Sequence, residues 1–220
     1  MEHVNRKPHY GVYATAILIT LLFFILGIMM GNYVAYKKVG ALDISQRAIS
    51  VLADFANLKS EAFLNDSADY CSLDWSAIWE EKVAIGTILT SLEQKFGKTN
   101  KDVMEQKKLY QDVQIKTLRL IERINEKCDS EWNIILFFYT NDEGKKGDAK
   151  LSELQGYILD TIAKDNMDKV RIFAFDINID NEGTNELMKT YNITSAPSLV
   201  INKKLYNWFM SKYEIQQIIE

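Results

Sequence analysis

The sequence predicts a mixed α/β domain at the C-terminal end of the chain, preceded by one transmembrane helix and an α-helical region that contains an antiparallel hairpin. Three observations lead to this fold class. Residues 11–36 contain no Asp, Glu, Lys or Arg, residues 42–128 repeat apolar side chains at helical spacing, and residues 131–220 alternate apolar β-type runs with amphipathic helices. Residues 1–10 form a short tail ahead of these parts.

The predicted transmembrane helix is the uncharged run of residues 11–36. A helix needs about 20 apolar residues to cross a bilayer, and this run is long enough. Tyr10 and Tyr13 stand at one end and Tyr33 and Tyr36 at the other, as expected of aromatic side chains at the two membrane interfaces. The alternative is a cleaved signal peptide, whose apolar region spans only about 7–15 residues. We therefore expect a retained single-pass anchor in contact with membrane lipid.

A first helix is predicted directly after the membrane segment, over residues 43–65. Asp43 followed by Gln46 is typical of a capping-box start. The helix then carries a narrow apolar seam made of Ile44, Ala48, Val51, Phe55, Leu58 and Ala62. Such a seam serves either a coiled-coil contact with a second copy or another partner, or the packing of a small helical bundle. Both interpretations stay open for this helix.

Two further helices are predicted to form the antiparallel hairpin. The first covers residues 74–96 and ends at Gly97-Lys98, and Thr99-x-x-Asp102 is a capping signature for the second, which continues to Lys127. Each helix is apolar along one side. This pattern favours a hairpin that buries its own seams, or packs on the C-terminal domain, over an oligomerisation surface.

The two cysteines, Cys71 and Cys128, flank the hairpin. They lie 28 residues before and 29 residues after Thr99, so an antiparallel pairing brings them to the same end. A disulfide there would contribute roughly 4 kcal/mol in the chain-entropy model. Because stable disulfides belong to oxidising compartments, the pair indicates an extracytoplasmic soluble part, whereas the nearly equal basic charges on both sides of the membrane segment favour neither orientation. The alternative is two unrelated buried thiols in a cytosolic domain.

Residues 131–220 contain strands and helices in the order β-α-β-α-β-β-α. Apolar runs rich in β-branched and aromatic residues mark the strands, and apolar side chains three or four positions apart mark the helices. The predicted strands cover residues 132–139, 170–178, 198–202 and 205–210. The predicted helices cover residues 149–165, 186–191 and 211–219, with turns at residues 181–184 and at Lys203-Lys204.

Pro197 is one of only two prolines in the chain, and it stands between a predicted helix and a predicted strand. The bond between Ala196 and Pro197 is of the kind that adopts the cis form at low cost, and a cis proline in a tight turn usually has a purpose. The alternative is an ordinary trans proline at the start of an edge strand.

Two stretches carry a resemblance to a known superfamily. "FDINIDNEGTNELMKTYNITSAPSLVI" is similar to the thioredoxin segment that leads from the central strand to the cis-proline, and "IILFFYTN" is similar to the strand before the active site. The resemblance covers residues 131–220 and implies a thioredoxin-like fold without its first strand and helix. In thioredoxins the backbone beside the cis-proline pairs with a bound peptide, so the resemblance makes Ala196 and Pro197 the candidate binding face.

The chain departs from the superfamily at the active site. Thioredoxins carry Cys-x-x-Cys at a helix N-terminus, where the helix dipole lowers the thiol pKa. Residues 140–148 contain no cysteine, and Glu143 and Lys146 stand at the two cysteine positions. We therefore expect no dithiol exchange at this degenerate site. The only histidines, His3 and His9, lie in the N-terminal tail, so we expect no histidine base, metal or other cofactor in the folded region.

Charge limits the partners. Beyond residue 10 the chain carries 24 Lys and Arg (26 less Arg6 and Lys7) against 29 Asp and Glu (30 less Glu2), a net charge of −5. This balance argues against nucleic acid as the main ligand. The glycine-bracketed loop of residues 143–148 is interpreted as a solvated turn, with an anion site at the following helix start as the alternative.

Three functions stay open at this point. The first is a membrane-anchored, redox-inactive thioredoxin-like protein that binds polypeptide or assembles with other membrane proteins. The second is a thiol-disulfide oxidoreductase that uses Cys71 and Cys128 as its exchange pair, which needs an exposed disulfide or a low-pKa thiolate. The third is a helical oligomerisation or scaffold protein that the C-terminal domain caps.

Overall fold

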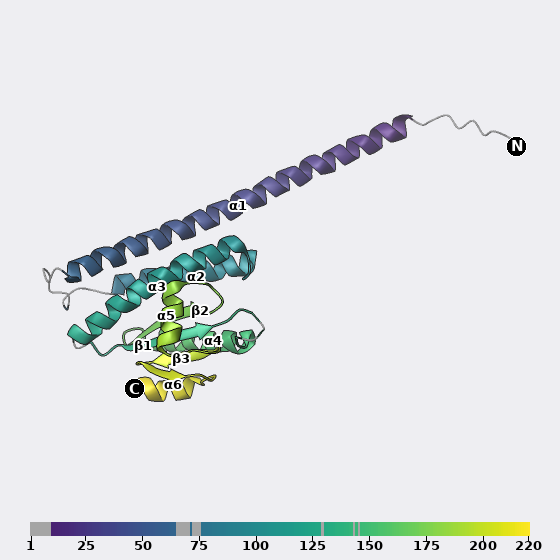
Figure 1. The fold of residues 1–220 in the computed structure, drawn as a ribbon. Helices are drawn as coiled ribbons and strands as arrows, with labels where there is room; N and C mark the ends of the chain where they lie inside the picture. The colour runs from purple at the N-terminus through teal and green to yellow at the C-terminus, as the bar shows by residue number, and fades with distance from the viewer. Residues whose placement is uncertain (1–9, 65–70, 72–75, 129, 143, 145) are drawn as a thin grey trace. The chain divides into compact units, whose positions relative to one another are not determined.

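The computed structural model describes residues 10–64, 71, 76–128, 130–142, 144 and 146–220. They form six helices and four strands in the order α1-α2-α3-β1-α4-β2-α5-β3-β4-α6 (Figure 1). The chain divides into two compact units, Met1–Ile44 and Ser45–Glu220. The second unit is a mixed α/β structure with a four-stranded sheet, as the sequence predicts.

The first helix, α1, runs without interruption over Tyr10–Leu64. It includes a segment with a mean hydropathy of 2.5 that is long and apolar enough to cross a membrane. The prediction of a separate helix starting at Asp43 is wrong, because Asp43 lies inside α1. Residues 37–42 contain no proline, and the single Gly40 costs only about 1 kcal/mol, so nothing in this stretch ends the helix.

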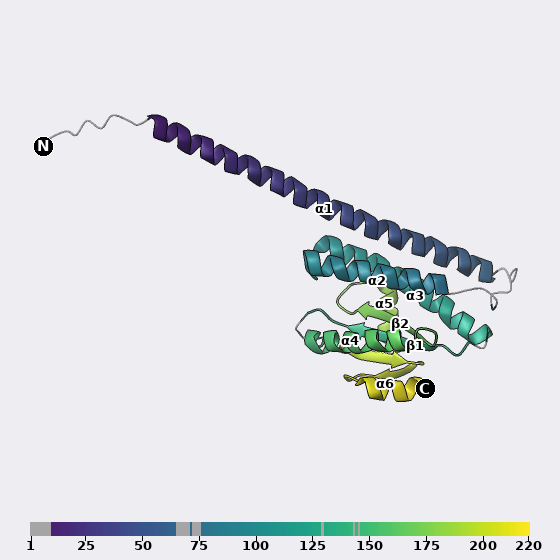
Figure 2. The same ribbon diagram turned by 180° about the vertical axis from the view of Figure 1, so that it is seen from behind.

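The hairpin consists of α2, Ser76–Phe96, and α3, Lys101–Lys127, which run side by side (Figure 2). Gly97 adopts a φ of +95° in the turn, a conformation that favours glycine. The N-cap of α3 is Asn100, whose side chain accepts a hydrogen bond from the Asp102 amide at 3.1 Å. The predicted Thr99 cap is therefore displaced by one residue, and Asn caps helices at least as well as Thr.

The sheet contains β1 (Asn133–Tyr139), β2 (Val170–Asp176), β3 (Ser198–Ile201) and β4 (Lys204–Tyr206), in the spatial order β2-β1-β3-β4. Strands β1 and β2 are parallel, whereas β3 is antiparallel to both β1 and β4. Because β3 starts opposite the end of β1, the Ala196–Pro197 segment lies at the carboxyl end of the two parallel strands.

The remaining helices are α4 (Ala149–Asp165), α5 (Glu182–Thr190) and α6 (Lys212–Ile219). The bounds of α4 agree with the prediction, but α5 begins earlier, since the Asn181 side chain caps it by accepting a hydrogen bond from Thr184. The predicted strand 205–210 ends at Tyr206. Its turn lies at Asn202 and Lys203, with φ values of +49° and +70°, rather than at Lys203-Lys204.

Side chains alternate across the sheet and form two cores. On one face Leu136, Phe138 and Val200 pack against α3 and α5, and on the other Ile135, Phe137 and Leu199 pack against α4 and α6. The phenylalanines at the first core are fully buried, including Phe138, Phe173 and Phe175. The hairpin is therefore a structural layer of the α/β unit, because α3 supplies one side of its core.

Strand β2 is an edge strand, and side chains of the hairpin cover its free edge. The Gln114 amide donates to the Ala174 carbonyl at 2.9 Å and accepts from the Ala174 amide at 3.1 Å. Gln111 donates to the Asp176 carbonyl at 3.4 Å, and Lys82 donates to the Ile172 carbonyl at 2.6 Å. An open edge is a template for pairing with another chain, so the hairpin blocks β2 by satisfying its backbone groups.

Candidate functional site

The Ala196–Pro197 peptide bond is cis and lies just before β3. Both residues are buried, with Ala196 only 5% exposed. Of the residues predicted at the degenerate active site, Lys146 is exposed in the loop before α4, and Glu143 lies outside the described residues. Lys146, Gly147 and Asp148 contact the backbone of Ala196.

The loop before α4 pairs with the backbone of Ala196 on both sides. The Ala196 amide donates to the Lys146 carbonyl at 2.9 Å, and the Asp148 amide donates to the Ala196 carbonyl at 3.0 Å. Gly147 thus forms a parallel bridge with Ala196. The backbone groups that the resemblance assigns to a bound peptide are therefore already used by the chain itself.

Gly147 is required for this close approach. Its φ is +149°, and a Cβ added there would lie 2.2 Å from the Ala196 carbonyl oxygen. Because the clashing atom belongs to the backbone, a small side-chain movement cannot relieve the overlap. The glycine therefore fixes the loop against the cis-proline segment.

Asp148 occupies the N-terminus of α4. Its carboxylate accepts a hydrogen bond from the Leu151 amide at 2.8 Å and caps the helix. A carboxylate at this position also satisfies the positive end of the helix dipole. The Asp148 carboxylate therefore occupies the helix start at which the sequence offered an anion site as the alternative.

A buried charge cluster lies at the carboxyl ends of β1 and β2. The Lys107 ammonium is 2.7 Å from both the Asp176 and the Glu93 carboxylates, and it stands 5.2 Å from the centre of the Tyr139 ring. The Asn141 amide donates to Asp176 at 3.1 Å. The cluster joins α2, α3 and the sheet, with Lys107 and Asp176 buried and Glu93 partly exposed.

The cluster is unsuited to proton transfer near neutral pH. Burial, which lowers the pKa of Lys107, is outweighed by Tyr139, Asp176 and Glu93, so this pKa lies well above its usual value. Burial raises the pKa of Tyr139 to about 12 despite the neighbouring Lys107. Both groups keep one protonation state across the physiological range. We interpret the cluster as a brace between the hairpin and the sheet.

Lys82 is the second buried lysine. It is 6% exposed, and burial lowers its pKa to about 7. Its ammonium lies 4.4 Å from the centre of the Trp79 ring and 4.9 Å from that of Phe173, positions that stabilise the charged form. Arg171 also contacts Trp79, at 5.1 Å. Lys82 is the one described lysine whose pKa is lowered into the neutral range.

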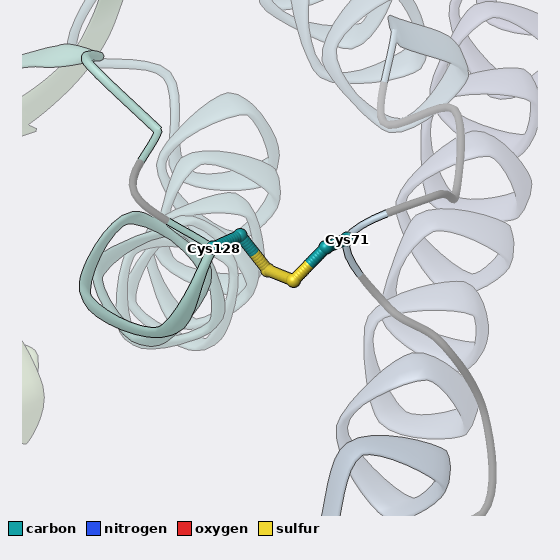
Figure 3. Close-up of a disulfide and its surroundings, with 2 residues drawn as sticks. All are labelled: Cys71 and Cys128. Carbon is teal, nitrogen blue, oxygen red and sulfur yellow. A yellow bond between two sulfur atoms is a disulfide. The ribbon is translucent and has the colours of Figure 1, made fainter.

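Cys71 and Cys128 form a disulfide, as the sequence predicts (Figure 3). Cys128 is the C-cap of α3, at the negative end of the helix dipole. Exchange-active thiolates sit instead at helix N-termini or beside cations, where their pKa is lowered. The position of Cys128 therefore favours a structural bridge, although Cys71 is exposed.

Sequence reasoning missed the polar side chains that hold the hairpin to β2. Lys82, Lys107, Gln111 and Gln114 are all buried. The available signal was in α3, where Lys107, Gln111 and Gln114 fall at helical spacing within the apolar stripe. Polar residues at core positions predict buried hydrogen-bonding partners, but the sequence does not identify β2 as that partner.

No family model matches this chain, and no curated protein matches it.

Proposed function

We propose that this chain is a single-pass membrane protein whose thioredoxin-like domain has no redox activity and serves to bind a polypeptide or to assemble with other membrane proteins. The soluble part lies outside the cytoplasm in this proposal. The observation that carries it is the thiol-free position beside Pro197, where Lys146, Gly147 and Asp148 stand against Ala196.

The thioredoxin-like assignment is supported by three features of the C-terminal region. The elements from β1 onward follow the order β-α-β-α-β-β-α, and the strand before α4 lies beside the strand that follows the cis-proline. The helix after β1 starts next to that proline, through the Asp148 to Ala196 hydrogen bond.

A role without catalysis is supported by the positions of the cysteines. Both are joined in the disulfide at the end of the hairpin. Cys128 precedes the amino end of β1, whereas Ala196 lies at the carboxyl end of that strand, so the disulfide and the cis-proline belong to opposite ends of the sheet. The disulfide also supports the extracytoplasmic location.

The loop against Ala196 makes peptide binding at the Ala196 backbone costly. Peptide pairing at Pro197 requires the contacts from Lys146 and Asp148 to break, at a cost of about 0.5–1.5 kcal/mol for each hydrogen bond. A partner that binds elsewhere on the domain avoids this cost. We therefore expect the polypeptide or membrane-protein partner to bind a surface other than the Ala196 backbone.

Two measurements test this function, an activity assay on the full chain in lipid nanodiscs and native mass spectrometry of the natively extracted protein. In an insulin-reduction assay with dithiothreitol, we expect the reduction rate with the chain to equal the rate with dithiothreitol alone. A faster rate that is lost in Cys128→Ser would support the thiol-disulfide oxidoreductase instead. In native mass spectrometry of protein extracted from its own membranes, we expect masses above the 25.4 kDa of one chain, equal to the chain plus a polypeptide or a second copy. A single species at the mass of one chain refutes binding and assembly.

A further inference from the structure

A groove with a volume of about 470 Å³ opens at the amino end of β1. It lies between the second half of α3, the β3–β4 turn and the end of α6, away from the cis-proline. Its volume falls within the range of about 300–1,000 Å³ that is typical of ligand sites. Its apolar floor consists of the partly exposed Trp132, Ile134 and Ile218, and the nearly inaccessible Leu136 and Val200 lie at its base.

The walls of the groove are held in place by asparagine side chains. Asn125 donates to the Trp132 carbonyl at 3.1 Å and accepts from the Trp132 amide at 3.0 Å. Asn202 accepts from the Ile134 amide at 3.0 Å and donates to the Asn133 side chain at 2.6 Å. A site fixed in this way loses little conformational entropy when it binds a ligand.

The charge of the groove is negative. Its lining contains Glu122, Glu131 and Glu220 against Lys169 and Lys203. The Lys203 ammonium already contacts Glu126 at 3.2 Å, outside the lining. Arg171, which contacts the Trp132 ring at 4.7 Å, has Asp168 as a neighbouring negative charge.

Glu122 is the half-buried acid of the groove. Among the residues that the structure describes, none donates a hydrogen bond to its carboxylate or forms an ion pair with it within 4 Å. Burial raises the pKa of Glu122, against the lowering effects of Lys203 and Arg119. A carboxylate in this setting gains most from a cation brought by a ligand.

We propose that this groove binds a cationic side chain of a polypeptide, with the charge beside the Glu122 and Glu131 carboxylates and the methylene stem on the apolar floor. The choice of a polypeptide rests on the function proposed above. The site lies away from the cis-proline segment and needs no displacement of the loop before α4.

The test is a methyl NMR titration of the full chain in nanodiscs, labelled at isoleucine δ1 methyls. Ile134 and Ile219 line the groove, and Ile162 on the buried side of α4 serves as the internal reference. The probe is the tripeptide N-acetyl-Ala-Lys-Ala-amide, and its matched control replaces lysine by norleucine, which keeps the stem and removes the charge. We expect saturable shifts of Ile134 and Ile219 with the lysine probe alone.

Glu122→Gln should weaken binding of the lysine probe about tenfold, since it removes one partly buried charge contact. Glu105→Gln, an exposed acid on the same helix, should leave the affinity unchanged. Equal binding of the norleucine probe, no saturation, or an unchanged affinity in Glu122→Gln each overturns the inference. If the NMR titration fails but native mass spectrometry detects a complex, only the groove proposal is overturned. If native mass spectrometry detects the single chain alone, the proposed function is overturned.

Discussion

The contact between Gln114 and the free edge of β2 offers a direct test of how the hairpin is attached. Gln114 is 2% exposed, and its side-chain amide makes both of its hydrogen bonds to the backbone of Ala174, at 2.9 and 3.1 Å. Gln114→Met keeps the length and most of the volume of the side chain. The substitution therefore removes the two hydrogen bonds with little change in packing.

The expected magnitude follows from the two backbone groups left behind. A buried donor or acceptor that loses its partner costs about 1–3 kcal/mol, so the Ala174 amide and carbonyl together predict a loss of about 2–6 kcal/mol in the free energy of unfolding. Ala174 is only half-buried, which favours the lower part of that range. Even this loss is a large part of the roughly 5–15 kcal/mol of a typical domain.

The assay is urea unfolding of the full chain in detergent micelles, followed by tryptophan fluorescence, because Trp79 and Trp132 both pack against the core that contains Phe173. Hydrogen exchange over residues 170–176 reports the Ala174 amide directly. Gln94→Met, an exposed glutamine in α2, is the matched control. A Gln114→Met chain as stable as the wild type, with the Ala174 amide still protected, would refute the edge contact as a source of stability.

Three further substitutions test other parts of the structure. Gly147→Ala should cost about 1–3 kcal/mol by breaking two hydrogen bonds to Ala196, seen as faster exchange of the Ala196 amide; unchanged exchange contradicts the fixed loop. Replacing both cysteines by serine should lower the unfolding free energy by about 4 kcal/mol in urea, and a loss below about 1 kcal/mol contradicts a structural bridge. Burial lowers the Lys82 pKa from 10.5 to about 7, so the unfolded chain binds more protons between these values and stability should rise with pH across that window. Lys82→Met should flatten this rise of at most about 1.4 kcal/mol per pH unit, and an equal rise in both chains contradicts the assignment.

The sequence predicted those features that local patterns determine. A periodic segment specified the helix of residues 149–165, which turns one side to a core, and continuous apolar runs specified the two parallel strands, which contribute to both cores. The spacing of Cys71 and Cys128 about the turn predicted their pairing. The continuous α1 was missed because Asp43 and Gln46 also satisfy a capping pattern inside a helix, where the local signal is ambiguous.

The contacts that hold the hairpin and the loop before α4 in place could not be predicted, because they join residues distant in the sequence. Lys107 and Asp176 are 69 positions apart, and Gln114 and Ala174 are 60 apart. The pairing of Gly147 with Ala196 depends on a close backbone approach that the glycine permits but does not encode. For such pairs the sequence shows a buried polar residue or a glycine, while the partner depends on the assembled topology.

The two ends of the sheet differ in which polar and charged groups they offer to a partner. At the carboxyl end the chain fills its own site, because Lys107 neutralises Asp176, Asp148 caps α4 and the loop uses both backbone groups of Ala196. At the amino end the groove keeps the Glu122 carboxylate without an ion pair inside 4 Å among the described residues. A ligand at the carboxyl end must replace existing bonds, whereas a cation at the amino end adds a new one. This asymmetry is why we propose that recognition takes place at the end of the domain opposite the cis-proline.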